Sequence, residues 1–150
     1  MKVVKNRAKQ IVEFIKTNRV EFIILVFILL LGSFFRFYRL PEYMTFLGDE
    51  GRDALAVKRM IVNHKFRLIG PVTSIGNMYL GPLYYYLMLP AMVISRLSPV
   101  GPAAMVAILG IITIGLVWWI GREWFNREAG LIASFLYAIS PAVITYSQSS

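Results

Sequence analysis

The chain has 150 residues, of which 57% are hydrophobic and 16% charged, and it has no cysteine. Because ordinary globular proteins are about 45–50% apolar, this composition nearly excludes a water-soluble enzyme and favours a membrane protein, and the missing thiols exclude disulfide bonds and a cysteine nucleophile. The net charge of +8 gives little support to nucleic-acid binding, since in so apolar a chain basic residues more often flank membrane spans and contact lipid headgroups.

Residues 1–19 carry six of the sixteen basic residues, ahead of the first apolar run. By the positive-inside rule, this predicts a cytoplasmic N-terminus. Val4, Ala8, Ile11 and Ile15 recur at helical spacing, so we expect a basic amphipathic helix on the cytoplasmic membrane surface. A solvated basic tail is the alternative interpretation.

Three apolar runs are long enough to cross a bilayer whose hydrocarbon core is about 30 Å thick. They predict transmembrane helices at residues 20–38, 102–121 and 129–146, with a short cytoplasmic turn at 122–128. Glu21 and Arg36 lie at the ends of the first run, where we expect their charges to snorkel to the membrane surface. No small-residue cleavage pattern follows this run, which argues against a signal peptide.

The run from Leu80 to Ser95 has two interpretations. Two prolines interrupt it, and tyrosines crowd its start. If it crossed the membrane, the basic turn at 122–128 would lie outside, against the positive-inside rule. We therefore expect residues 82–96 to form a helix that is tilted or lies shallow at the outer surface, with a fourth span as the alternative.

These assignments leave residues 39–101 as an outer loop that is rich in polar residues in its first half. Helix-forming residues predict a helix at 50–62 with Asp49 as its N-cap, and glycine–proline breakers predict a loop at 66–81. Polar residues end the chain where the last span emerges, so we expect an N-terminal part of a longer protein. The predicted architecture is an all-α, polytopic integral membrane protein.

The segment from Gly48 to Asp53 concentrates charge directly after a span. It holds the carboxylates of Asp49, Glu50 and Asp53 and the guanidinium of Arg52. On a helix, Asp49 and Asp53 share a face beside Arg52, which can pair with either of them or with a phosphate. A carboxylate so placed can accept a proton from an attacking hydroxyl. The structural interpretation is a helix cap at Asp49 and a surface ion pair between Arg52 and Asp53.

Four features follow one another along the chain. They are a basic N-terminus with one span, the pair Asp49-Glu50 opening the outer loop, the segment Gly81-Pro82-Leu83-Tyr84-Tyr85-Tyr86, and the run from Gly121 to Leu131 leading to Ile139-Ser140-Pro141 and Tyr146-Ser147-Gln148-Ser149. In this order they resemble the GT-C membrane glycosyltransferases, in particular bacterial relatives of the dolichyl-phosphate-mannose protein mannosyltransferases and the lipid A aminoarabinose transferase. The resemblance implies a GT-C-like N-terminal transmembrane module whose outer loop bears interfacial helices.

The resemblance also implies an activity. Members of the family transfer a sugar, with inversion and without a nucleotide sugar, from a polyprenyl-phosphate donor to a lipid, glycan or protein acceptor at the outer membrane face. Asp49 matches the position of the family's general base, and Glu50 would help to seat the acceptor or the base. Relatives often carry a lysine or histidine before Pro-Pro-Leu, whereas this chain has Leu80-Gly81 before Pro82-Leu83, which puts that phosphate contact in doubt.

The predicted site combines one catalytic residue with several binding residues. Asp49 is the catalytic candidate, and the predicted substrate-binding residues are Glu50, Arg52, Asp53, Tyr84 and Tyr85. Arg52, Lys65 and Arg67 are local candidates to contact a departing phosphate. For His64, Lys65 and Arg67 the favoured interpretation is contact with lipid headgroups, the ordinary role of basic residues near membranes. No cofactor is predicted, and metal binding has little support because His64 has no second histidine beside it.

The predicted partners are the polyprenyl-phosphate sugar donor, membrane lipids and an unidentified acceptor, with no nucleic acid. The predicted location is the cell membrane, crossed several times. The alternative function is a non-enzymatic membrane transport or assembly protein in which Asp49, Arg52 and Asp53 form an interfacial salt-bridge cluster. A transporter usually places ionisable residues within its spans, and the centres of these spans have none, which favours the enzyme.

Overall fold

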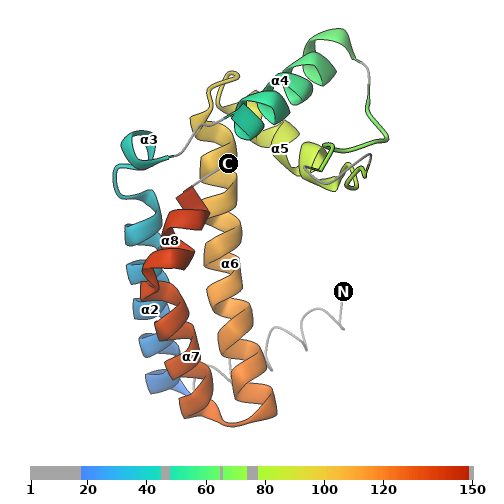
Figure 1. Ribbon diagram of the computed structural model, residues 1–150. Coiled ribbons are helices and arrows are strands. Elements are labelled where there is room, and N and C mark those ends of the chain that lie inside the picture. The colour runs from blue at the N-terminus through green and yellow to red at the C-terminus, as the bar shows by residue number, and fades with distance from the viewer. Residues whose placement is uncertain (1–17, 45–47, 65, 74–77, 149–150) are drawn as a thin grey trace, which may run out of the picture. The chain divides into compact units, whose positions relative to one another are not determined.

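The computed structural model describes residues 18–44, 48–64, 66–73 and 78–148. Within these residues the chain is predominantly helical, which confirms the predicted all-α class (Figure 1). The helices are α2 (Arg19–Phe37), α3 (Leu40–Tyr43), α4 (Gly48–Asn63), α5 (Leu83–Ile94), α6 (Val100–Trp124), α7 (Arg127–Ile139) and α8 (Pro141–Gln148). Most of the basic segment at 1–19 lies outside the described residues, so its amphipathic helix stays a prediction.

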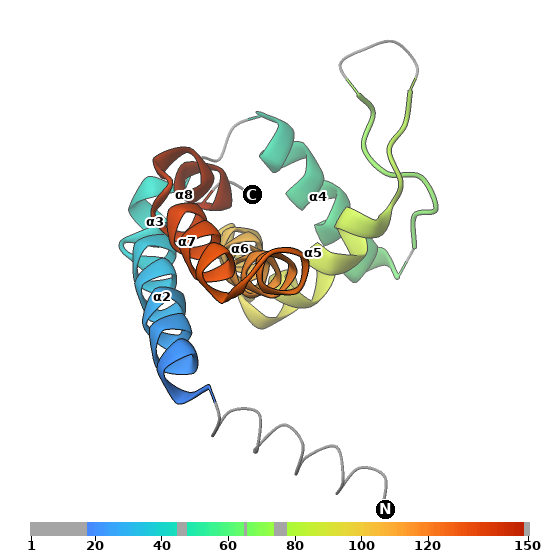
Figure 2. The ribbon, with the colours of Figure 1, turned by 90° about the horizontal axis from the view of Figure 1, so that it is seen from below.

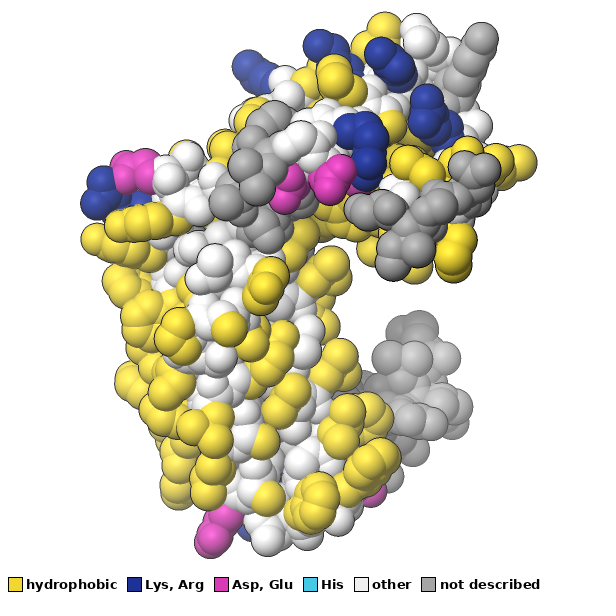
Figure 3. All heavy atoms as spheres, in the orientation of Figure 1, with side chains coloured by type: hydrophobic (Ala, Val, Ile, Leu, Met, Phe, Trp, Pro, Cys, Tyr) yellow, Lys and Arg dark blue, Asp and Glu magenta, His cyan; other side chains and the backbone are white. Residues whose placement is uncertain are grey.

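Two helices in the described part of the chain, α2 and α6, are long and apolar enough to cross a membrane. A third such span is present if α7 and α8 are counted together. Many large apolar side chains of α2 and α6 are exposed rather than packed in a core, and hydrophobic side chains cover much of the surface of these helices (Figure 3). A helix that is apolar on all sides is typical of a protein core or of a membrane span.

The segment predicted as one helix at 129–146 is two helices, which corrects the prediction. α7 ends before Ser140, whose backbone is extended (φ −62°, ψ 119°), and Pro141 begins α8. Proline disfavours helical dihedral angles at the residue before it and has no backbone N–H. The helix therefore breaks at Ser140-Pro141 although the run of apolar residues continues.

The turn between α6 and α7 is shorter than the turn predicted at 122–128. The two helices leave only Phe125 and Asn126 between them. The Asn126 side chain accepts a hydrogen bond from the backbone N–H of Ala129 at 2.8 Å and so caps α7. Capping by Asn126 lets α7 begin at once, and the charged residues around it belong to helices instead of a loop.

The described residues form two compact units. Residues 18–34 and 111–140 belong to the first unit, and the described residues of 35–110 and 141–148 belong to the second. In the first unit, α2, α6 and α7 contribute to a small buried cluster of apolar side chains. Its members are Ile28, Ile114 and Ala138. Figure 2 shows the ribbons of these helices from below.

Glycine allows α6 and α7 to approach closely. A Cβ atom on Gly121 would lie 2.8 Å from the Cα atom of Gly130, and one on Gly130 would lie 2.8 Å from the backbone nitrogen of Arg122. Real Cβ atoms do not come so near to backbone, so a larger residue at either glycine would push the helices apart. Small residues at such a crossing are typical of helices that pack in membranes.

Glu21 is buried near the start of α2 and does not snorkel as predicted. Its Oε1 lies 2.7 Å from Nε of Arg122 and accepts a hydrogen bond from Nε1 of Trp118 at 3.2 Å, while Oε2 lies 3.8 Å from Nε of Arg127. Burying a carboxylate is costly unless it is paired and hydrogen-bonded, so these contacts explain why Glu21 can be buried. They also place the start of α2 beside the end of α6 and the start of α7.

Arg36, near the other end of α2, is also buried rather than snorkelling. It lies against Gly110 in the second unit, where a Cβ atom would come within 2.8 Å of its Nε. Gln148 of α8 donates hydrogen bonds from Nε2 to the backbone oxygens of Phe35 at 3.1 Å and Arg36 at 3.4 Å. Because Gly110 has no side chain, it leaves space for the Arg36 guanidinium. The snorkelling rule had instead placed this group at the membrane surface.

The second unit has a core between α4 and α5, to which each helix contributes one apolar stripe at helical spacing. The buried members are Ala56, Val57 and Met60 of α4 and Tyr85, Met88 and Met92 of α5. The two helices agree to within two residues with those expected at 50–62 and 82–96. Because of this packing, the face of α4 that carries Asp53 lies against α5.

The segment at 66–81, expected to be a plain loop, contains a short hairpin. Val72 and Tyr79 form an isolated antiparallel bridge, and the N–H of Gly70 donates a hydrogen bond to the oxygen of Leu80 at 3.0 Å. A Cβ atom on Gly70 would lie 2.7 Å from that same oxygen. Glycine is therefore required where the two arms of the hairpin meet.

Candidate functional site

α4 begins with the acidic residues on which the functional prediction depends. The helix already includes Gly48, so Asp49 lies in its first turn instead of at the N-cap, which corrects the predicted cap. The Asp49 side chain is 80% exposed, and its Oδ1 lies 3.0 Å from Nη1 of Arg52. Glu50 is partly buried. Carboxylates are favoured in the first turn of a helix by the positive end of its dipole.

Arg52 connects this exposed carboxylate to a buried one. Its Nε donates a hydrogen bond to Oδ1 of Asp53 at 3.1 Å, while its Nη1 faces Asp49. Asp53 is buried, and the same Oδ1 accepts a hydrogen bond from the hydroxyl of Tyr85 at 3.3 Å. Two carboxylates therefore hold the Arg52 guanidinium in one orientation, and Tyr85 of α5 holds one of those carboxylates.

Burial and charge change the pKa values in this cluster. Burial, followed by the negative charges of Asp53 and Glu50, raises the pKa of Tyr84 to about 12. Burial and the nearby Asp53 also raise the pKa of Tyr85, and the hydrogen bond to Asp53 raises the pKa of Arg52. Near neutral pH, Tyr85 thus stays protonated and donates to Asp53, and Arg52 stays positively charged.

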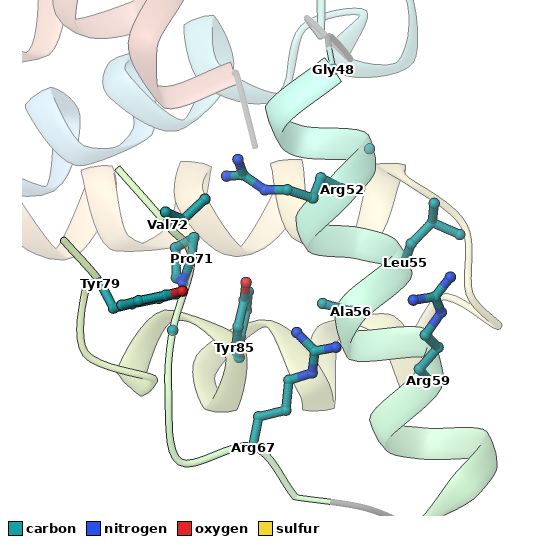
Figure 4. Close-up of a pocket in the computed structure, with 12 residues that line it drawn as sticks. Gly48, Arg52, Leu55, Ala56, Arg59, Arg67, Pro71, Val72, Tyr79 and Tyr85 are labelled. Carbon is teal, nitrogen blue, oxygen red and sulfur yellow. The ribbon is translucent and has the colours of Figure 1, made fainter. Parts of the chain in front are cut away.

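A cavity of about 620 Å³ is lined by residues of α4, α5 and the hairpin segment (Figure 4). Among the described residues, the charged side chains that line it are all arginines: Arg52 and Arg59 of α4, and Arg67. In Figure 4, Tyr85 lies between Arg52 and Arg67. Basic side chains that line a concave surface create a positive potential, which attracts anionic ligands.

The rest of the cavity wall is small or apolar. Gly48, Gly51 and Ala56 bring the ligand space close to the backbone of α4, and Pro71, Val72 and Tyr79 form the opposite wall on the hairpin. Guanidinium groups bind phosphate oxygens through two parallel hydrogen bonds, and an aromatic ring can pack against a sugar. The cavity therefore has the chemistry to hold an anionic group attached to a less polar one.

Three of the predicted site residues form hydrogen bonds with one another, and a fourth is connected to them by an ion pair. Arg52, Asp53 and Tyr85 are in contact, and Asp49 is attached through Arg52. Tyr84 packs against the core between α4 and α5. Neither Glu50 nor Tyr84 is among the residues that line the cavity, and neither is Asp49 itself. The roles of all these residues in binding and catalysis remain predictions.

Sequence reasoning did not include Arg59 in the site. Arg52, Ala56 and Arg59 are four and three residues apart, which places them on one face of a helix. That spacing was the signal that could have found Arg59. Arg67, a candidate for phosphate contact for which headgroup contact was the favoured interpretation, lines the cavity, whereas Lys65 lies outside the described residues.

The two carboxylates that contact Arg52 differ in burial. Asp49 is exposed, while Asp53 is buried against α5. In the part of the chain that the structure describes, no group of three or more histidine, aspartate or glutamate side chains is placed to hold a metal ion.

Comparisons of the chain with protein-family models, with curated proteins and with solved structures gave no match. The functional assignment therefore depends on the motifs of the sequence and on the geometry of the site.

Proposed function

We propose that this chain takes part in inverting sugar transfer from a polyprenyl-phosphate donor to a lipid, glycan or protein acceptor at the outer face of the cell membrane. The observation that carries the proposal is the arginine-lined cavity, in which Arg52 both lines the wall and contacts Asp49. Support also comes from α2 and α6, which are long and apolar enough to hold such a site at a membrane surface where a lipid carrier presents its phosphate.

The proposed reaction is a single displacement at the anomeric carbon of the sugar. The acceptor oxygen forms a bond to this carbon as the bond to the phosphate oxygen breaks, and the phosphate leaves with the electron pair. Asp49 accepts the proton of the acceptor hydroxyl. Its high exposure supports this role, because an acceptor from outside must reach it. The products are the glycosylated acceptor and the polyprenyl phosphate.

The arginines of the cavity supply positive charge for the leaving phosphate. Charge develops on the phosphate as its bond to the sugar breaks, and positioned cationic donors stabilise that charge. Arg52, held by Asp53, would contact the donor phosphate, and Arg59 and Arg67 line the same cavity. Arg52 would thus serve both the donor and the orientation of Asp49.

The contacts of Glu21 with Trp118 and Arg122 support the proposed membrane arrangement. They place the start of α2 beside the end of α6, so within the first unit these helices run in opposite directions. The chain between two such spans must begin and end on the same side of the membrane. α5 has 12 residues and is only about 18 Å long, shorter than the ~30 Å hydrocarbon core. Both observations favour a shallow α5 over a fourth span.

A cysteine-labelling experiment tests this arrangement in a chain with no native cysteine. We expect Phe125→Cys to resist a membrane-impermeant maleimide in intact cells and to react after the cells are opened, because in the proposed arrangement the turn at 125–126 lies in the cytoplasm. Phe125 is exposed and, unlike Asn126, does not cap α7. Lys58→Cys on α4 is the matched control and should react in intact cells. Labelling of Phe125→Cys from outside would instead require the fourth span.

A transfer assay tests the activity itself. The full-length protein, purified and placed in lipid nanodiscs, is given a radiolabelled polyprenyl-phosphate hexose together with a lipid extract and an envelope-protein extract as acceptors. We expect label to move to one acceptor fraction, and no transfer when a nucleotide sugar replaces the lipid donor. If the protein hydrolysed a nucleotide sugar, or transferred sugar from it without the lipid donor, the proposed donor class would be rejected.

One observation favours the non-enzymatic alternative. Arg52 makes ion pairs with both Asp49 and Asp53, as expected of a salt-bridge cluster at a membrane surface. Exposed ion pairs such as Arg52–Asp49 typically contribute only about 0–1 kcal/mol to stability, and their presence alone does not indicate catalysis. The two functions differ in what substitution of Arg52 does: in a structural cluster it would leave no donor-dependent activity to lose, whereas in the transferase it would impair use of the donor.

A further inference from the structure

The hairpin and its flanks expose many large apolar side chains. Apart from Tyr79, which lines the cavity, six of them between residues 66 and 83 are between 56% and 85% exposed. They are Phe66, Leu68, Ile69, Met78, Leu80 and Leu83, which we call the apolar loop patch. None of them belongs to the core cluster between α4 and α5. Exposed apolar side chains gathered in one short segment mark a surface that contacts a protein or a membrane.

The charge around the apolar loop patch is positive. The sequence has no acidic residue between Asp53 and Glu123, whereas residues 54–99 contain five basic ones. Of these, Lys58 and Arg59 are exposed on α4, and Arg67 lies within the patch segment. Figure 3 shows dark blue basic side chains and yellow hydrophobic side chains on this part of the surface. Apolar side chains combined with basic ones are typical of segments that lie in the headgroup region of an anionic membrane.

The backbone of the hairpin is suited to a less polar environment. The N–H of Thr73 donates a hydrogen bond to the oxygen of Met78 at 2.9 Å, and its hydroxyl donates to the same oxygen at 3.2 Å. The N–H of Leu80 donates to the oxygen of Pro71 at 2.9 Å. Backbone groups that enter a bilayer need partners within the protein, and these hydrogen bonds pair some of the backbone groups of the described arms.

The flanking helices would hold this segment at a membrane surface. α2 ends and α6 begins on either side of residues 38–99, and both are long and apolar enough to span. A segment fixed at both ends to one face of a bilayer meets that surface at high effective concentration. Even side chains with modest affinity for lipid then remain in contact with it.

We propose that the apolar loop patch inserts into the boundary between headgroups and acyl chains of the outer leaflet, with anionic phospholipid as its partner. The hairpin forms one wall of the arginine-lined cavity, so insertion would anchor that cavity at the depth where a lipid carrier presents its phosphate. This inference rests on the membrane placement within the proposed function, and it does not depend on the reaction.

Fluorescence quenching by labelled lipids tests the proposal. Leu68→Cys and Met78→Cys are made separately in the full-length protein, labelled with an environment-sensitive fluorophore and reconstituted into vesicles of phosphatidylcholine and phosphatidylglycerol. Phosphatidylcholine with a nitroxide high on its acyl chain serves as the quencher. Val62→Cys on α4 is the matched control, because Val62 is apolar and 60% exposed but lies outside the patch.

We expect blue-shifted emission and strong nitroxide quenching at both patch positions, and weaker quenching at Val62. Quenching should decrease when phosphatidylglycerol is replaced by phosphatidylcholine. Equal quenching at all three positions would overturn the proposal, and so would a blue shift without quenching, which would mean that protein covers the patch. The readout needs no donor or acceptor, so this failure leaves the transferase proposal standing. Failure of the protein to float with the vesicles would reject membrane placement itself.

Discussion

Replacement of Asp49 by asparagine in the full-length protein is expected to lower sugar transfer by about 10²- to 10⁴-fold, the usual contribution of general-base catalysis. Asparagine keeps the size and shape of the side chain and is tolerated in the first turn of α4, but it has no negative charge and cannot accept the proton. The measurement is initial transfer rate with the polyprenyl-phosphate donor, at equal amounts of folded protein. The loss should appear in kcat more than in KM, because Asp49 is not among the residues that line the cavity.

Asp53→Asn is a useful comparison because the two aspartates share one arginine. Asp53 is buried and bonded to Tyr85, so its loss should reduce stability and disturb the orientation of Arg52 without removing the proton acceptor. We expect Asp53→Asn to retain more activity per folded molecule than Asp49→Asn. Near-normal turnover by well-folded Asp49→Asn would exclude Asp49 as the base and turn attention to Glu50.

Replacement of Arg52 by alanine is expected to weaken use of the donor by about tenfold or more, the effect of losing a charge-assisted hydrogen bond to phosphate. The change should raise the donor KM, because Arg52 lines the cavity, and Arg52→Lys should recover part of the loss by keeping the charge without the planar guanidinium. The measurement is the donor dependence of transfer in nanodiscs.

Arg39→Ala is the matched control for Arg52→Ala. Arg39 also pairs with a carboxylate three residues away, Glu42, but it does not line the cavity. We expect its donor KM to be unchanged. If both substitutions changed the donor KM equally, or if Arg52→Ala did not change it, Arg52 would be only a partner in surface ion pairs.

The helical class and most helix positions could be predicted because they follow from local patterns. The apolar stripes of α4 and α5 and the long apolar runs of α2 and α6 are visible in the sequence. The break at Ser140-Pro141 was missed because the uncharged run continues through it, although proline itself was the available signal. The cap at Asn126 was missed because the surrounding charges suggested a longer turn.

The contacts of the site could be predicted only in part. Pairing of Arg52 with Asp49 follows from their spacing of three residues on a helix, whereas Asp53 is the next residue in the sequence. The hydrogen bond between Tyr85 and Asp53 joins residues 32 positions apart, so it depends on how α5 packs on α4. Burial of Glu21 and Arg36 likewise depends on partners from distant helices, whereas snorkelling is a rule for a single helix considered alone.

The shortness of α7 has a consequence for how the protein would enter the membrane during synthesis. Its 13 residues reach only about 20 Å, less than the ~30 Å needed to cross the hydrocarbon core. The tight turn after α6 and the contact between Gly121 and Gly130 join it to a helix that is long enough. If the protein spans a membrane, α6 and α7 would enter the bilayer as one helical hairpin, and α8 would add the apolar length that α7 lacks by itself.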